Sequence, residues 1–155
     1  MPRTRFIVAL AVVSSALGAG CAEPNSLSGS ITDSHDLSFD TVQLRLFTDQ
    51  QAWELRYEKA LDSGDQDIVA KVVLDVPEGG LVLDAPIDVL AEDGRIERIT
   101  AKNDPFPSVE DADVTFTAGG VEDGAATTGT WGATFDNGKT ISGTFEATLE
   151  HASFE

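Results

Sequence analysis

The chain has 155 residues, of which 41% are hydrophobic, and these values predict one globular domain and exclude a disordered chain. Its formal charge of −17 excludes nucleic acid as an electrostatic partner and leaves cationic proteins and cations, although solubility alone also explains such a charge. With one cysteine, no disulfide can form within the chain.

The first twenty residues have the layout of a bacterial export signal. Two arginines precede an uninterrupted apolar stretch over residues 6–13, and small residues then lead to Cys21. That stretch is too short to span a bilayer, which takes about twenty residues. We therefore predict a signal peptide over residues 1–20. Its removal would leave 27 acidic and 8 basic residues, a formal charge of −19.

The end of this segment, Leu17-Gly18-Ala19-Gly20-Cys21, resembles the lipobox of bacterial lipoproteins. In that family the cysteine is diacylated, for example with palmitate, and becomes the new amino terminus. Gly18 departs from the family pattern, which usually has a large aliphatic residue there. The resemblance implies lipidation at Cys21 and membrane anchoring in the cell envelope, because two acyl chains anchor stably. Ala22, in place of an aspartate, implies the outer membrane rather than the inner one.

Two alternatives for this segment stay open. An ordinary signal cleaved after Ala22 would leave a soluble secreted protein, and a cytoplasmic protein could bury Cys21 in its core. Residues 21–26 are largely polar and contain Pro24, so we expect a tether without fixed structure. The domain itself is then expected over residues 27–155.

Val, Ile, Thr and Phe alternate with polar and turn residues along this domain, which predicts an all-β fold. We expect an antiparallel β-sandwich, and the alternative is a closed β-barrel with one short helix near residues 49–61. The nine predicted strands cover residues 27–31, 37–47, 52–61, 67–76, 81–90, 95–102, 112–118, 127–135 and 139–149.

Between the first two predicted strands, Ser34-His35-Asp36 contains the residue types of a hydrolase triad. Members of a triad meet in space from distant positions, so we predict only a polar turn. In the second strand the apolar phase shifts from Leu37 and Phe39 to Val42, which predicts a bulge or a break near residues 40 and 41.

Residues 49–61 fit two structures. Trp53, Leu55 and Tyr57 alternate with charged residues, as in a strand. Residues 48–51, however, have the spacing of a capping box, and apolar residues after them also share one helical face. We predict the strand.

Residues 62–67 form the densest acidic cluster. In an exported β-domain such a cluster suggests a calcium-binding site. Asp62, Asp65 and Asp67 are the candidate ligands, but their spacing is not that of a helix-loop-helix calcium site, and the residues favour a solvated turn. A zinc site would need carboxylates, because His35 and His151 are the only histidines. No catalytic or cofactor-binding residue is predicted.

Residues 67–76 and 81–90 are both apolar at alternate positions. A four-residue loop between them would pair Val76 with Leu81 and make one side wholly apolar, so we predict a hairpin. Three valines on its other side call for partial cover: Val69, Val73 and Val82. Further along, Phe106 in the proline-rich loop 103–107 is either an exposed partner contact or a ring tucked against the core.

The last predicted hairpin has a register that the residues determine. A two-residue turn at Asn137-Gly138 would mix core and solvent faces, whereas a three-residue loop over 136–138, with Gly138 left-handed, separates them. This register pairs Ala133 with Ile141, Trp131 with Gly143 and Gly129 with Phe145, so two large rings cover two glycines. Residues 129–149 also resemble terminal hairpins of small bacterial lipoproteins.

These patterns predict a lipid-anchored extracytoplasmic β-domain with a non-enzymatic binding or envelope-structural role. Its partner would be a protein or glycan, and not nucleic acid. Two alternatives remain: an anchored hydrolase that uses paired carboxylates on glycans, and a calcium-stabilised module.

Overall fold

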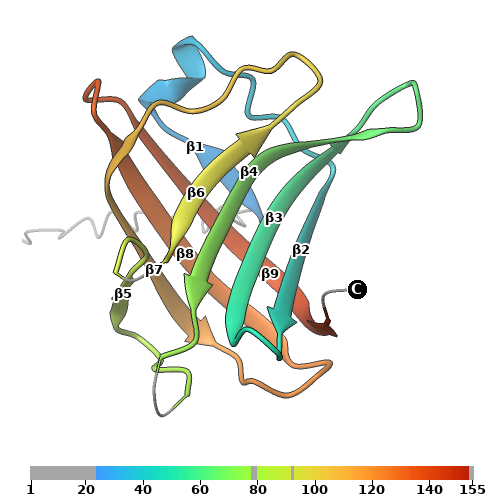
Figure 1. Ribbon diagram of the computed structural model, residues 1–155, viewed down its shortest axis with the longest axis vertical. Coiled ribbons are helices and arrows are strands. Elements are labelled where there is room, and N and C mark those ends of the chain that lie inside the picture. Colours follow the sequence, from blue (N-terminus) through green and yellow to red (C-terminus); the bar gives the residue numbers. More distant parts are fainter. Residues whose placement is uncertain (1–23, 78–79, 92, 154–155) are drawn as a thin grey trace, which may run out of the picture.

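The computed structural model describes residues 24–77, 80–91 and 93–153, and strands make up nearly all of their regular secondary structure (Figure 1). No α-helix occurs in these residues, and one 3-10 helix follows the first strand. In chain order the elements are β1 (Ser26–Ser28), η1 (Ser30–Asp33), β2 (Thr41–Phe47), β3 (Ala52–Ala60), β4 (Gln66–Asp75), β5 (Pro86–Asp88), β6 (Arg95–Ile99), β7 (Val109–Ala118), β8 (Ala126–Phe135) and β9 (Thr140–Ala152).

The strands form one curled sheet in the order β5-β7-β8-β9-β2-β3-β4-β6, with β1 added to β9. In Figure 1, β2, β3, β4 and β6 lie in front of β7, β8 and β9, so the two halves of the sheet face each other as a half-barrel. β9 joins the halves: residues 140–148 pair with β8, and residues 149–152 pair in parallel with β2. The all-β prediction is confirmed, and the curled sheet combines the facing halves of a sandwich with the continuous path of a barrel.

Aromatic side chains fill the space between the two halves. Trp53 of β3 packs on Phe116 of β7 with ring centroids 5.3 Å apart. Tyr57 accepts a hydrogen bond from Trp131 Nε1 at 3.0 Å and donates one to the Thr144 carbonyl at 2.8 Å. Burial raises the pKa of the Tyr57 hydroxyl, so it stays protonated and able to donate.

The terminal hairpin has the predicted register. Trp131 pairs with Gly143 and Gly129 with Phe145, and Gly138 is left-handed at φ 75°. A side chain at Gly143 would collide with the Trp131 indole, and one at Gly129 would meet the Phe145 ring. The two rings therefore occupy the space that the glycines leave open, as predicted.

The predicted hairpin of residues 67–76 with 81–90 is wrong. β4 pairs with β3 on one edge and with β6 on the other, so neither edge is available. Of residues 81–90 only β5 is a strand, and it pairs with β7. Pro86 lacks an N–H donor and suits such an edge position. An alternating pattern specifies which face is apolar, but it does not specify the neighbouring strand.

The outer valines have three different environments. A register shift in the pairing of β3 with β4 leaves Val69 without a partner on β3 and turns it into the core. Val73 is buried on the outer face, whereas Val82 is 52% exposed. Of the three valines expected to be partly covered on the outer face, only Val73 is buried there.

The ends of the first strands also differ in part from the prediction. Gly29, at φ 137°, ends β1, and the chain continues into η1, which buries Ile31. The predicted break near residues 40 and 41 is confirmed, because β2 begins at Thr41. Residues 52–60 form strand β3, as predicted, rather than the alternative helix.

Candidate binding site

The wall of the half-barrel is interrupted where β1 and β2 both border β9, along a line that we call the seam. β1 pairs with residues 142–144 of β9, whereas β2 pairs with β9 only from Leu44 onward. Between β1 and the segment that precedes β2 lies a groove of about 740 Å³. Residues 24–27 line one side of this seam groove, and Thr32 and residues 35–40 line the other.

The amino-terminal wall of the groove is held on β9 by side chains as well as by the strand ladder. Asn25 Oδ1 accepts the Glu146 N–H at 2.7 Å, and the Ser26 and Thr144 hydroxyls lie 2.9 Å apart. Leu27 is opposite Gly143 and packs against the core. The expectation that the tether lacks fixed structure is therefore wrong for Asn25 and Ser26.

The opposite wall, residues 36–40, alternates between buried and exposed positions. Leu37 is buried and Phe39 partly buried, with the Phe39 ring edge-on to Tyr57 at 5.0 Å between centroids. The three residues between and beside them are exposed: Asp36, Ser38 and Asp40. This period of two gives the groove an apolar floor and a polar rim.

The rim carries two carboxylates. Asp36 accepts hydrogen bonds from Lys59 Nζ at 2.9 Å and from the Ser38 N–H at 3.0 Å, and these bonds hold the pKa of Asp36 well below its usual range. Asp40 accepts the Ala60 N–H at 2.8 Å. Asp36 therefore stays ionised at every physiological pH.

Ser34-His35-Asp36 does not form a triad. His35 Nδ1 lies 2.9 Å from Ser34 Oγ, but His35 Nε2 lies 3.2 Å from the Pro105 carbonyl. The Asp36 carboxylate binds Lys59 and Ser38 and not the imidazole, so no acid orients His35. The prediction of a polar turn is confirmed.

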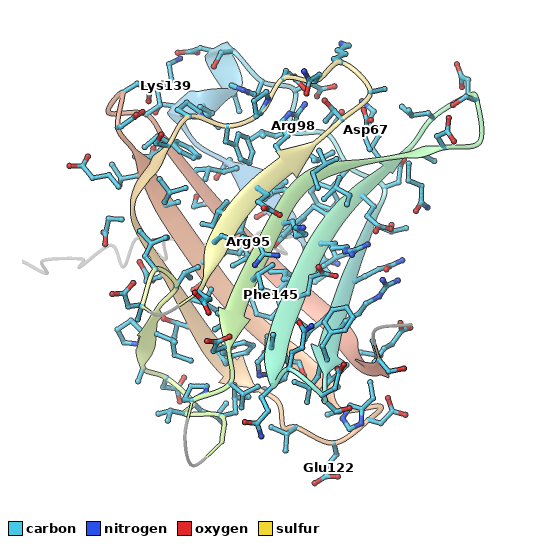
Figure 2. All side chains as sticks on the ribbon, in the orientation of Figure 1. Asp67, Arg95, Arg98, Glu122, Lys139 and Phe145 are labelled. Atoms are coloured by element: carbon cyan, nitrogen blue, oxygen red, sulfur yellow. The ribbon has the colours of Figure 1, made fainter. Side chains whose placement is uncertain are left out.

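Arg98 supports the groove from inside the half-barrel, at the end where Figure 2 labels it. Its side chain is 5% exposed, and Nη1 donates to the Asp36 and Val69 carbonyls, both at 3.1 Å. Nη2 lies 3.3 Å from the Asp104 carboxylate. A hydrogen bond from Thr100, followed by Arg98, lowers the pKa of Asp104 against the effect of burial.

Phe106 is tucked against the core. Its ring centroid lies 5.4 Å from that of Phe135 and 5.4 Å from that of His35, and the Arg98 guanidinium lies 5.8 Å from it. Of the two expectations for this ring, the exposed contact is wrong.

The structure does not gather the predicted calcium ligands into a site. Asp65 accepts a hydrogen bond from Ser63 at 3.0 Å, and Asp67 accepts the Ala101 N–H at 2.7 Å. Within the described residues, no group of three or more His, Cys, Asp or Glu side chains could hold a metal ion. Asp62 and Asp65 instead belong to the turn before β4, where Asp65 bonds Ser63, and Asp67 lies in β4 and bonds the distant Ala101.

The outer face of the front half carries carboxylates that are matched by basic side chains. Arg56 lies 2.6 Å from Glu54 and 3.7 Å from Glu58, and Lys71 bonds Glu97. Burial opposes ionisation of Glu97, but Lys71 and Arg95 outweigh it and lower its pKa. A glycosidase needs one carboxyl group with a raised pKa, whereas the pKa values of Asp36, Glu97 and Asp104 all move downward.

Comparisons with protein-family models, curated proteins and solved structures found no match. In the part of the chain that the structure describes, no helix is long and apolar enough to cross a membrane. Cys21 and the predicted signal lie outside the described residues.

Proposed function

We propose that this protein is a lipoprotein of the bacterial cell envelope, anchored through Cys21, whose β-domain binds an envelope or extracellular partner without catalysing a reaction. The export signal, the lipobox-like end and the solitary cysteine support the anchor. The seam groove supports binding, because it is concave and partly apolar and its lining includes two carboxylates, Asp36 and Asp40.

The distance between the anchor and the groove carries the proposal. Pro24 lines the groove and follows Cys21 by three residues, which can span at most about 11 Å when extended. Asn25 and Ser26 are bound to β9, so no long tether separates the domain from Cys21. Acylation of Cys21 would therefore hold the seam side of the half-barrel close to the bilayer.

A binding role fits the site better than hydrolysis. The carboxylates of the groove rim are occupied by hydrogen bonds from Lys59, Ser38 and Ala60, and Asp36 is held ionised. Neither property suits a general acid, which must hold a proton near neutral pH. An ionised rim is instead suited to attracting cationic groups.

The test is a comparison of the native protein with a Cys21→Ser variant by intact mass and membrane fractionation. We expect the native chain to begin at Cys21, to carry acyl chains and to separate with outer membranes on a density gradient. The Cys21→Ser protein should lack the acyl mass and leave the membrane fraction. An Ala22→Ser variant, which keeps the cysteine, is the matched control and should behave as the native protein. Two soluble, unacylated proteins would overturn the anchor.

The calcium-stabilised alternative is tested separately. A ligand that binds only the folded state must raise the unfolding midpoint as its concentration rises. Since Asp65 and Asp67 already bond within the chain, we expect the same midpoint in calcium and in chelator. A midpoint that rises steadily with calcium would favour the alternative.

A further inference from the structure

We infer that the seam groove accepts an extended peptide with alternating apolar and basic residues, which adds to the wall as a strand between β1 and residues 36–40. The inference rests on the binding role proposed above and names its partner class. It follows from three properties of the groove: its strand edges, its alternating floor and rim, and its charge.

The two sides of the groove are strand β1 and residues 36–40, which belong to no strand but lead directly into β2. No described strand pairs with the edge of β1 that faces away from β9. Before Leu44, β2 pairs with β3 and not with β9. The segment before β2 is tied to β3 by the Asp40 N–H, which donates to the Glu58 carbonyl at 2.8 Å. Such edges can exchange backbone hydrogen bonds with an added strand.

The side chains of the groove match the period of a strand. Leu27, Leu37 and Phe39 pack on the core and form the floor. Asp36 and Asp40 are exposed on the rim and lie four positions apart, which is two repeats of a strand. A strand laid in the groove would place alternate side chains on the floor and the others beside these carboxylates.

Charge selects the outward residues of the peptide. The chain from Cys21 onward carries −19, so an acidic peptide is repelled before it reaches the groove. The Asp36 side chain is 58% exposed even though Lys59 binds it, and this leaves it accessible to a second cation. His35, the other titratable group that lines the groove, bonds Ser34 and Pro105. Lysine or arginine therefore suits the outward positions.

The test uses three acetylated and amidated pentapeptides with the protein carrying Cys21→Ser. The first is Lys-Val-Lys-Val-Lys, the second has N-methylvaline at both valines, and the third replaces lysine by glutamate. We expect the first to bind in calorimetry and the other two to bind at least about tenfold more weakly, because one lacks the N–H donors of the valines and the other reverses the charge. Changes in amide chemical shift should gather in residues 24–28 and 36–41.

Site variants make the test specific. Asp36→Asn with Asp40→Asn should weaken binding of the lysine peptide about tenfold, while Asp113→Asn, an exposed acid on β7, should leave it unchanged. Asparagine keeps an acceptor for the Ala60 N–H, so the fold should be retained. A thermal melt of each variant confirms this before binding is measured.

Four results would overturn the inference. These are no binding of the lysine peptide, equal binding of the lysine and glutamate peptides, equal binding of the N-methylated peptide, and shift changes outside the groove. Displacement of the lysine peptide by phosphatidylethanolamine vesicles would assign the groove to a lipid head group instead. Loss of acylation would refute the anchor without affecting peptide binding, so failure of the anchor and failure of the peptide site can be told apart.

Discussion

The β8–β9 wall and the seam lie on the two sides of the same strand, β9, but they are closed in different ways. β8 pairs with β9 over nine residue pairs, and buried rings cover the glycines between them. β1 pairs with β9 over three residue pairs, and side-chain bonds such as that of Asn25 with Glu146 complete its attachment. At the seam, apolar side chains cover the core although no continuous ladder of backbone hydrogen bonds joins β1 to β2. The backbone edges at the seam therefore remain available to pair with an added strand.

The largest effect is expected where the closed wall is tightest. Gly143→Val should lower the free energy of unfolding by about 3 kcal/mol, because a side chain there collides with Trp131 and approaches the Tyr57 hydroxyl. Gly132→Val is the matched control, since a Cβ at that position would lie 3.9 Å from its nearest neighbour, the Ile141 carbonyl oxygen. Urea unfolding should show a change below about 0.5 kcal/mol for the control. Equal costs at both glycines would refute the role of the covering rings.

The next effect concerns the hydrogen bonds that join the two halves of the sheet. Tyr57→Phe removes the acceptor of Trp131 Nε1 and the donor to the Thr144 carbonyl, both in the core. Leaving the buried Trp131 N–H without a partner should cost about 2 kcal/mol in urea unfolding. A cost below about 0.5 kcal/mol would mean that these bonds do not stabilise the joint between the halves.

The smallest effect is expected at the seam. Asp36→Asn should cost less than about 1 kcal/mol near neutral pH, because the pair with Lys59 is exposed. The lowered pKa of Asp36 means that its stabilisation is present above the unfolded value, about 4, and is lost as the pH falls through the lower folded value. Urea unfolding of both proteins should therefore show a difference that shrinks below about pH 4. A stability difference between the two proteins that grows as the pH falls would contradict a stabilising role of the ionised Asp36.

The sequence predicts local pairing well and distant pairing poorly. The terminal hairpin could be derived because its loop, its glycines and its rings lie close together in the chain and only one register keeps the faces separate. Residues 81–90 have an equally clear alternation, but they pair with β7 across the half-barrel. The strands that border β4 are chosen by packing of the whole sheet, which the local pattern does not contain.

The seam groove could not be predicted from the sequence, because it brings residues 24–27, at the start of β1, beside residues 35–40, which precede β2. The sequence does indicate that Arg98, which supports the groove, points inward. Arg98 has the same phase as the buried Ile96 in β6, so the alternation places its charged side chain on the inner face. An inward arginine needs buried acceptors, and it finds them in the Asp36 and Val69 carbonyls. The sequence alone does not identify these partners, because both are backbone groups of distant segments.

Native-state hydrogen exchange of the full-length protein tests the contrast between the two walls most directly. We predict that amides of β1 and residues 36–43 exchange through local opening, at least about a hundredfold faster than amides in the centre of the β8–β9 ladder. The ladder amides should exchange only with the free energy of global unfolding. Equal protection of the seam and the ladder would contradict this contrast, since the seam would then be closed as firmly as the rest of the wall.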